Sequence, residues 1–520
     1  MFSFPWWLSL FIGFLSLSEE ILWVRVVGFA FQTLPFAFSF VLACYLVGIA
    51  LGAALGKRLC ARTQNLYGAA AVVLGVAALA DAWTPQLITD FLLPSNSYRL
   101  GVFAVAIVVA AALKSILFPI AHHLGSFAEG PRVGRSVSRI YFGNIIGATL
   151  GPLVTGFVAL DHLNVDECFA LAGAACLLVC VACALRSGKW QFICVPLAAA
   201  MLLSTFAVRV ARPGPGSLRM LALGGSASLT HFSANRHGVI HTVLTNVGDF
   251  VFGGNVYDGI ASVNLEVNAN RLDRVYLLAL LRPDARRVLT VGLSGGAWVR
   301  ALQGFPGVED IDVVEINPAY VDLIRSYPEL APLLDDPRIH IHIDDGRRWL
   351  KRNPQTRYDL IVQNTTYHWR ANAGNLLSRE YLTEVRKHLN PGGVVTTNTT
   401  GSFDVLATAR AVFPYAYRYA NFAYASDHPL TPDLDLLKQV RRPDGTPLAA
   451  AAAPAGSVVA LLANAHLEPA DTFIAQRQAD AQVISDDNLL SEYRHGRRFG
   501  PGLLRRLLPG EPAHFELDDP

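Results

Sequence analysis

The clearest chemical signal in this sequence is a run of small residues followed, further along, by an acid. The run holds Gly292, Ser294, Gly295 and Gly296. It lies where the apolar stretch 286–292 gives way to residues with helical spacing. Small residues let the backbone approach a ligand, and the first turn of a helix offers free N–H donors. Glu315 ends the next apolar stretch, where a carboxylate accepts hydrogen bonds from ribose hydroxyls.

Asp345 and Gly346 follow the third apolar stretch and strengthen the interpretation as a nucleotide site. The glycine run lacks the full G-x-G-x-x-G pattern of dinucleotide sites, so a single nucleoside ligand is favoured. Together these features predict a bound adenosyl nucleotide. The alternative is a site that keeps the fold and has lost its ligand.

A second cluster of polar and aromatic residues, 363–370 (QNTTYHWR), follows the fourth apolar stretch. Ligands of open parallel sheets bind beyond the carboxyl ends of the strands, so chemistry is expected there. Asn364 can hydrogen-bond an amine, and a histidine such as His368 can act as a general base near neutral pH. Tyr367 and Trp369 can stack on a cation or cage it. The alternative is a hydrogen-bonded loop with buried aromatic rings.

The second half alternates strands and helices in a way that would bring these residues together. Strands are expected at 286–292, 310–316, 338–343, 357–363 and 392–398, with helices between them. This order is typical of an α/β Rossmann-like domain of the class I methyltransferase type, with a doubly wound parallel sheet. Short β-rich stretches between 239 and 267 predict a small N-terminal β-sheet, and 456–465 predicts one more strand.

The first half predicts a multi-span α-helical membrane domain of about seven transmembrane helices. Hydrophobic residues make up 52% of the whole chain and charged residues only 16%. A helix needs about 20 apolar residues to cross a bilayer. Such runs lie near 5–29, 35–56, 66–88, 100–121, 141–160, 167–185 and 191–209. A multi-pass protein of the cell (inner) membrane, in contact with the lipid bilayer, is therefore expected.

The organisation expected along the chain has five parts. These are a membrane domain at 1–210, a linker at 211–236, a small β-sheet plus helix at 237–282, a Rossmann-like nucleotide-binding domain at 283–465 and a C-terminal extension at 466–520. Basic loops follow the second, fourth and sixth predicted spans, which puts the amino terminus in the cytoplasm and the second half outside. An adenosyl substrate is made inside the cell, and that argument favours a cytoplasmic second half instead.

Several other functions are disfavoured by composition. The second half carries 30 Lys and Arg against 33 Asp and Glu, without the basic footprint that nucleic-acid binding needs. The cysteines lie in the first half without metal-like spacing, so no metal is expected. Glu20, Arg25 and Lys114 lie within predicted spans. Such costly groups indicate either snorkelling or an ion pair that fixes helix packing, or a site for a polar or cationic solute.

Taken together, these motifs resemble the spermidine synthase (polyamine aminopropyltransferase) family, specifically its membrane-fused branch. The resemblance rests on EILWVR, VYDG, VLTVGLSGG, VVEINP, DDPRIHIHIDDGRRWL and RYDLIV, which follow one another in the family's order. It implies that Glu315 holds the ribose and that Asp345 lies beside the adenine. It also implies that Tyr257, Asp258 and Gly259 form part of the wall between the small sheet and the main domain.

The sequence departs from the family pattern where the acceptor amine would bind. Two aspartates expected just past the fourth strand are replaced by Asn364 and Tyr367. The glutamine expected three residues after Gly259 is Ser262. Neither Asn364 nor Tyr367 carries a negative charge, so the resemblance implies the fold more strongly than it implies a diamine substrate.

Three functions follow from these observations. The first is a membrane-bound spermidine synthase-like transferase using decarboxylated S-adenosylmethionine, or a related adenosyl sulfonium, and a small amine or polyamine acceptor. Its catalytic residues would be Asn364, Tyr367 and His368, and its substrate-binding residues Tyr257, Asp258 and Trp369. The second is an S-adenosylmethionine-dependent methyltransferase with an Asn-x-x-Tyr turn at 364–367. The third is a non-catalytic nucleotide- or polyamine-binding domain on a transporter-like membrane part. A homo-oligomer is compatible with each.

Overall fold

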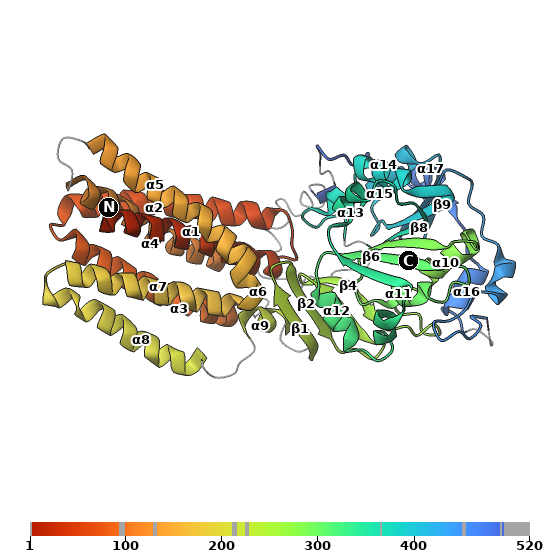
Figure 1. The fold of residues 1–520 in the computed structure, drawn as a ribbon, viewed down its shortest axis with the longest axis horizontal. Coiled ribbons are helices and arrows are strands. Elements are labelled where there is room, and N and C mark those ends of the chain that lie inside the picture. The colour runs from red at the N-terminus through yellow and green to blue at the C-terminus, as the bar shows by residue number, and fades with distance from the viewer. Residues whose placement is uncertain are drawn as a thin grey trace.

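The protein consists of a bundle of long helices and an α/β domain, joined end to end through a small sheet (Figure 1). The computed structural model describes residues 3–92, 99–127, 133–210, 216–223, 228–364, 367–449, 454–488 and 491–492. The α/β domain lies at one end of the bundle, and the amino terminus lies at the other (Figure 1).

The bundle contains the helices of the apolar first half. They are α1 (Phe4–Ala30), α2 (Phe36–Arg62), α3 (Leu66–Leu92), α4 (Arg99–Phe127), α5 (Val133–Val154), η1 (Thr155–Ala159), α6 (Leu160–His162), α7 (Val165–Arg186), η2 (Trp190–Phe192) and α8 (Cys194–Val210). In the part of the chain that the structure describes, five helices are long and apolar enough to cross a membrane. They are Phe36–Arg62, Leu66–Thr89, Leu100–Ser126, Gly134–His162 and Val165–Arg186. α1 and α8 correspond to the other two predicted spans, and a total of seven crossings stays a prediction.

The outer surface of the bundle is apolar, whereas its interior holds a group of charges. Large apolar side chains point outward, as is typical of helices that lie in lipid, and Leu178 for example is 73% exposed. Inside, the ammonium group of Lys114 contacts Glu19 at 2.8 Å and also pairs with Asp81. All three side chains are at most 3% exposed. Lys114 therefore forms an internal ion cluster that joins α1, α3 and α4.

A four-stranded antiparallel sheet separates the bundle from the main domain. α9 (Ser217–Leu223) precedes its strands β1 (Leu229–Asn235), β2 (Gly238–Val243), β3 (Asp249–Gly253) and β4 (Val256–Ala261), which pair in that order. The sheet begins at Leu229, inside the segment 211–236 that was expected to be a linker. Val239 packs among the apolar side chains of α1, so the sheet and the bundle share a core.

The main sheet has eight strands in the order β12-β10-β11-β9-β8-β5-β6-β7. Its parallel part is β5 (Arg287–Val291), β6 (Asp310–Glu315), β7 (Ile339–Ile343), β8 (Tyr358–Gln363) and β9 (Leu389–Asn398). The remaining strands, β10 (Tyr415–Tyr419), β11 (Phe422–Ser426) and β12 (Glu468–Pro469), are antiparallel. The α/β expectation is confirmed, but the sheet is mixed rather than wholly parallel.

Helices cover both faces of this sheet, which makes the domain doubly wound (Figure 1). One face carries α10 (Asp273–Leu281), α11 (Ala297–Leu302), α12 (Ala319–Arg325) and α16 (Val458–Ala463). The other carries α13 (Gly346–Arg352), α14 (Arg379–Lys387), α15 (Phe403–Val412) and α17 (Ala470–Gln476). The strand expected at 456–465 is wrong, because Ser457 caps a helix there by accepting a hydrogen bond from the Ala460 N–H. Val458 and Leu462, one helical turn apart, are both buried.

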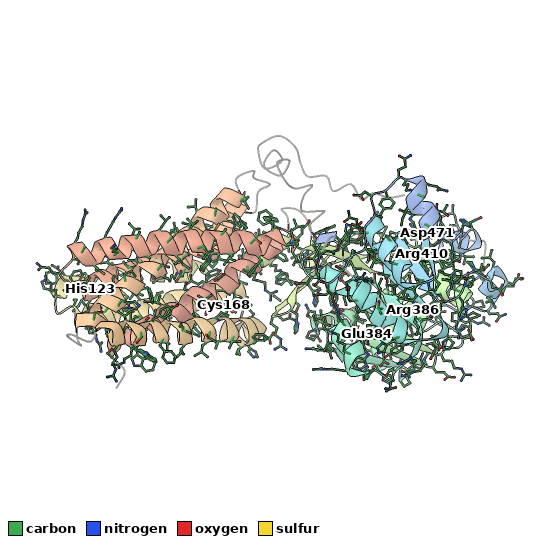
Figure 2. All side chains as sticks on the ribbon, turned by 90° about the horizontal axis from the view of Figure 1, so that it is seen from above. His123, Cys168, Glu384, Arg386, Arg410 and Asp471 are labelled. Carbon is green, nitrogen blue, oxygen red and sulfur yellow. The ribbon has the colours of Figure 1, made fainter. Side chains whose placement is uncertain are left out.

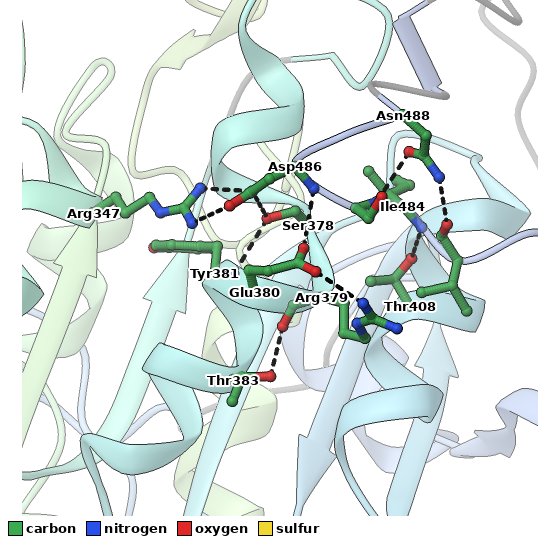
Figure 3. A network of polar contacts seen from close by, with 12 residues as sticks. Arg347, Ser378, Arg379, Glu380, Tyr381, Thr383, Thr408, Ile484, Asp486 and Asn488 are labelled. Atoms are coloured by element: carbon green, nitrogen blue, oxygen red, sulfur yellow. Dashed lines mark hydrogen bonds and ion pairs between the residues drawn. The ribbon is translucent and has the colours of Figure 1, made fainter.

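Ion pairs link neighbouring elements of the second of these helical layers. Arg410 of α15 contacts Asp471 of α17 at 2.8 Å, and the two lie beside each other in Figure 2, where Glu384 and Arg386 mark α14. Figure 3 shows how the segment around Asp486 is fixed to this layer. The carboxylate of Asp486 accepts from Arg347 at 2.8 and 2.5 Å and from the Ser378 hydroxyl at 2.6 Å. The C-terminal segment is thereby held against α13 and α14.

Candidate nucleotide and acceptor site

The loop after β5 approaches the end of β8 so closely that a side chain cannot fit between them. Gly292 has a φ of +91°, and a Cβ added there would lie 2.7 Å from the backbone oxygen of Asn364. Gly296 has a φ of +80°, and a Cβ added there would lie 2.8 Å from the side chain of Ile324. Glycine tolerates both the left-handed backbone and the close approach. The predicted ligand-binding loop thus has the backbone that its residue types indicated, and it lies next to Asn364.

Glu315 lies at the end of β6, buried against this loop and only 5% exposed. Its carboxylate accepts hydrogen bonds from the backbone N–H groups of Leu293 and Asn317, each at 2.8 Å. Burial raises the pKa of Glu315 to about 7, although these two hydrogen bonds act to lower it. Each carboxylate oxygen has two lone pairs, so the fixed carboxylate can still accept from a ligand hydroxyl.

Asp345 and Gly346 begin α13 at the end of β7. The Asp345 side chain caps that helix by accepting from the Arg348 N–H at 2.8 Å. A Cβ on Gly346 would lie 2.6 Å from a methyl carbon of Val291, so this helix start packs directly on β5. Asp345 is therefore held beside the loop by a local cap and by the close packing of the Gly346 backbone on the Val291 side chain.

Asp258 places a carboxylate opposite these groups, from β4 of the small sheet. The Tyr320 hydroxyl donates to this carboxylate, and the Ser294 hydroxyl donates to the Asp258 backbone oxygen at 2.5 Å. Burial raises the pKa of Asp258 to about 6, whereas the Tyr320 hydrogen bond and the positive charge of Arg370 act to lower it. The small sheet thus brings an ionisable acid to the loop, at a position that was expected to form a wall and to bind substrate.

One cavity of about 540 Å³ connects all of these groups. Its α/β side is lined by Gly292, Ser294, Glu315, Asp345, Gly346 and Asn364, together with Asp258 and Tyr320. This size falls within the range of roughly 300–1,000 Å³ that is usual for small-molecule sites. Five of the nucleotide residues predicted from the sequence, Gly292, Ser294, Glu315, Asp345 and Gly346, therefore meet in a single cavity with Asn364 and Asp258. Gly295 and Gly296 lie outside its lining, where they face Val251 and Ile324 respectively.

The aromatic residues predicted to hold the acceptor lie outside the cavity lining. Tyr367 packs on Trp369 with ring centroids 5.3 Å apart, in an apolar cluster with Leu34 and Val256. Trp369 is only 7% exposed. The ring of His368 is hydrogen-bonded to the Thr400 hydroxyl at 2.7 Å. These rings join the α/β domain to the bundle, because amphipathic aromatic side chains bury their apolar bodies where an apolar partner is available. Residues 365 and 366 lie outside the described residues.

Residues of the bundle complete the cavity. The sequence analysis named Arg25 only as a charged group within a span and did not connect it to the nucleotide site, and it did not name Thr33. Arg25 of α1 lines it and donates to the backbone oxygen of Asn235 in the small sheet. Thr33 lines it as well, and its backbone oxygen accepts from the Ala371 N–H at 2.9 Å. Arg370, the last residue of the predicted polar cluster, lies beside them with its guanidinium 3.3 Å from the Thr33 hydroxyl. In the sequence, the available signal for a role of Arg25 in the site was its position near the end of a predicted span.

The C-terminal segment supports the same wall from behind. The Glu492 carboxylate accepts from the backbone N–H groups of Asn372 and Gly374 at 3.0 and 2.8 Å. Asn372 lines the cavity, and its backbone is left-handed with a φ of +68°. The extension expected at 466–520 therefore includes a residue that fixes a turn of the candidate site.

Comparison with known proteins agrees with this architecture. Residues 275–411 match the family model described as spermine/spermidine synthase domain. The polyamine aminopropyltransferase of Mycobacterium tuberculosis (strain ATCC 25618 / H37Rv) is 26% identical over 505 residues, covering 88% of this chain and 90% of that protein. The spermidine synthase of Coffea arabica is 32% identical over 146 residues, covering 26% of this chain and 46% of that protein.

Solved structures of spermidine synthases also align with part of the chain. One, in complex with the transition-state analogue AdoDATO, has a TM-score of 0.37 at 17% identity and covers 41% of this chain and 79% of its own. A probable spermidine synthase from Corynebacterium glutamicum ATCC 13032 has a TM-score of 0.32 at 16% identity. The match covers 50% of this chain and 96% of that protein.

The fold and the site define a protein with long apolar helices followed by an α/β methyltransferase-like domain. Residues 275–411 of the chain match a spermine/spermidine synthase domain, and the resemblance to the spermidine synthase family predicted from the sequence is confirmed.

Proposed function

We propose that this protein is a membrane-bound aminopropyltransferase-like enzyme. It would transfer a group from decarboxylated S-adenosylmethionine, or a related adenosyl sulfonium, to an amine acceptor. The observation that carries the proposal is the single cavity in which the glycine loop, Glu315 and Asp345 face Asp258 and Asn364. The aminopropyltransferase names of the relatives support the same reaction class.

The nucleotide end of the cavity fits an adenosyl group. The close approach at Gly292 leaves the backbone open to a ligand, and the fixed Glu315 carboxylate can accept from the two ribose hydroxyls. Asp345, which lines the same cavity, would accept from the adenine amino group. The sulfonium carbon would then point toward Asp258 and Asn364.

The acceptor end supplies an acid in place of the expected aspartates. The acceptor nitrogen attacks the carbon bonded to the sulfonium sulfur, the C–S bond breaks, and its electron pair stays on sulfur as a neutral thioether. The nitrogen then releases a proton to Asp258, whose raised pKa suits a proton acceptor near neutral pH. Asn364 orients the amine. Asp258 replaces His368 in this role because His368 is engaged by Thr400 outside the cavity lining.

Methyl transfer is the less favoured use of the same cavity. Its sequence basis was an Asn-x-x-Tyr turn in which the tyrosine ring stacks on the acceptor. Asn364 lines the cavity, but Tyr367 packs on Trp369 instead.

We propose that the α/β domain faces the cytoplasm, because the adenosyl co-substrate is made there. Loop charge argues for the reverse orientation. Arg62 ends α2 and Arg186 ends α7 at the end of the bundle away from the α/β domain (Figure 1), and basic loops favour the cytoplasm.

A product assay on the detergent-purified full chain tests the activity. Decarboxylated or intact S-adenosylmethionine would be supplied with putrescine or another primary amine, and products followed by mass spectrometry. Methylthioadenosine with an aminopropylated amine is expected from the decarboxylated form. Methylated amine from the intact form alone would favour methyl transfer. Nucleotide binding without any product would favour a regulatory domain.

A further inference from the structure

The cavity continues past the acceptor end into the helical bundle. There it is lined by Val24, Gly28 and Phe29 of α1 and by Gly156 and Leu160 of the η1–α6 region. These helix ends face the α/β domain, and the ends of membrane spans lie at the level of lipid headgroups. The cavity is therefore a passage between the nucleotide loop and the membrane boundary.

Two glycines leave this passage open. A Cβ added to Gly28 or to Gly156 would meet no atom within 4 Å, apart from its immediate chain neighbours and its own helix backbone. Gly147 of α5, by contrast, would place a Cβ 1.9 Å from the backbone of Leu10, as in tight helix packing. Gly156 belongs to η1, a π-helical turn, and such turns often mark functional sites. The next residue, Phe157, is 62% exposed, so open space adjoins an apolar outer surface.

The charges along the passage change sign from one end to the other. Acids line the α/β end, whereas three guanidinium groups line the bundle end: Arg25, Arg236 and Arg370. The carboxylate of Asp161 lies 3.3 Å from Arg236 and offsets its charge, and Asp258 lies near Arg370. A diamine would bring its second ammonium group toward these guanidinium groups. An amine that carries an anionic group a few atoms away would be attracted instead, and arginine binds phosphate well.

We propose that the acceptor of this site is the primary amine of a phospholipid headgroup, with its phosphate at Arg25 and Arg236 and its acyl chains leaving past Gly28 and Gly156. The inference rests on the proposed function and names its substrate class. The amine nitrogen would form the new bond to the propyl carbon as the C–S bond breaks, and its proton would pass to Asp258. The products would be a headgroup with a secondary amine and neutral methylthioadenosine.

The test uses the full chain reconstituted into vesicles, with decarboxylated S-adenosylmethionine as donor. One set of vesicles contains phosphatidylethanolamine and phosphatidylcholine, and the other contains phosphatidylcholine alone with putrescine or phosphoethanolamine in solution. We expect an aminopropyl mass increase on phosphatidylethanolamine. Gly156→Leu, which fills the passage, should lower the lipid product by about tenfold or more, a difference of about 1.4 kcal/mol. Gly134→Leu, at a site equally free of neighbours on α5, should leave the lipid product unchanged.

The other outcomes distinguish failure of the lipid inference from failure of the proposed function. Product on putrescine but not on the lipid overturns the lipid inference and leaves the proposed function intact. Product on phosphoethanolamine and the lipid alike, with Gly156→Leu indistinguishable from Gly134→Leu, identifies a soluble phosphorylated amine and overturns the membrane route. No product with any acceptor, while the nucleotide still binds, overturns both proposals.

Discussion

The backbone oxygen of Asn364 lies 2.7 Å from the point where a Cβ on Gly292 would stand. This contact joins the end of β8 to the loop after β5, and thus the acceptor side of the cavity to the nucleotide side. The two halves of the candidate site therefore meet at a point where only glycine leaves enough room between them.

Gly292→Ala should therefore disrupt the site rather than only strain one residue. A left-handed non-glycine residue costs about 1–3 kcal/mol, and the clash with Asn364 adds to that. We expect a lower melting temperature and a loss of adenosyl-nucleotide binding by calorimetry. Gly401→Ala is the matched control, since Gly401 has a φ of +80° with no neighbour within 4 Å. Equal nucleotide affinity in the two variants would contradict the role of the close approach.

Glu315→Gln should weaken nucleotide binding and also lower the stability of the domain. The amide can accept on only one atom, whereas the carboxylate now accepts from Leu293 and Asn317 on separate oxygens. Losing a charged hydrogen-bond acceptor costs about 1.5–3 kcal/mol, which corresponds to roughly 10- to 150-fold in Kd. Titration calorimetry measures this change. Glu309→Gln, at an exposed ion pair with Arg286, is the control and should bind normally.

The rate should rise with pH through the titration of Asp258. The proposed base must be ionised, and its pKa is raised to about 6. Tyr320→Phe removes a hydrogen bond that lowers this pKa, so the rising limb of the kcat/KM profile should shift to higher pH. Asp258→Asn should remove the limb together with most of the rate. A limb that stays in place in Tyr320→Phe would mean that another group controls it.

The same raised pKa makes a prediction for stability, with the opposite sign. Between the ordinary value of 3.8 and about 6, the folded state binds more protons at Asp258 than the unfolded state does. The contribution of Asp258 to stability should therefore fall as pH rises through this window. Chemical unfolding at several pH values should show a smaller fall in Asp258→Asn than in the unmodified protein, and an identical slope would contradict the assignment.

Lys114→Met should destabilise the bundle strongly, because Glu19 and Asp81 would remain buried without their cation. Removing one partner of a buried ion pair typically costs about 3–5 kcal/mol. Adding Glu19→Gln and Asp81→Asn to Lys114→Met should restore much of that loss, since no uncompensated charge remains. Thermal unfolding in detergent compares the single and triple variants. A triple variant less stable than the single one would show that the charges themselves stabilise the bundle.

The orientation of the α/β domain is decided by reporter fusions at the two ends of the bundle. With a cytoplasmic domain, alkaline phosphatase fused after Gly216 should be inactive, and the same enzyme fused after Thr63 should be active. Thr63 follows α2 at the far end. The reversed pattern would agree with the basic loops instead, and the domain would then have no access to a cytosolic nucleotide.

The nucleotide end could be predicted because its determinants are local in sequence. Gly292, Glu315 and Asp345 each follow their own strand, and parallel strands bring their carboxyl ends to one edge. The acceptor end could not be predicted in the same way. Tyr367 and Trp369 have the composition of a cation cage, but Leu34, hundreds of residues away, packs on them. Only the tertiary structure shows that contact, and only it brings Asp258, which the family resemblance implied, into one cavity with Arg25.

Because the chain is synthesised from its amino terminus, Glu492 is added long after the helices of the bundle. Nearly the whole chain separates Arg25, which lines the cavity, from Glu492, which fixes its wall at Asn372. Domains form from the amino terminus onward during synthesis. The helices would reach the membrane long before the ribosome adds Glu492, so a nascent chain would hold an anchored but unfinished pocket. The protein would therefore begin to bind its substrates only after it had been placed in the bilayer.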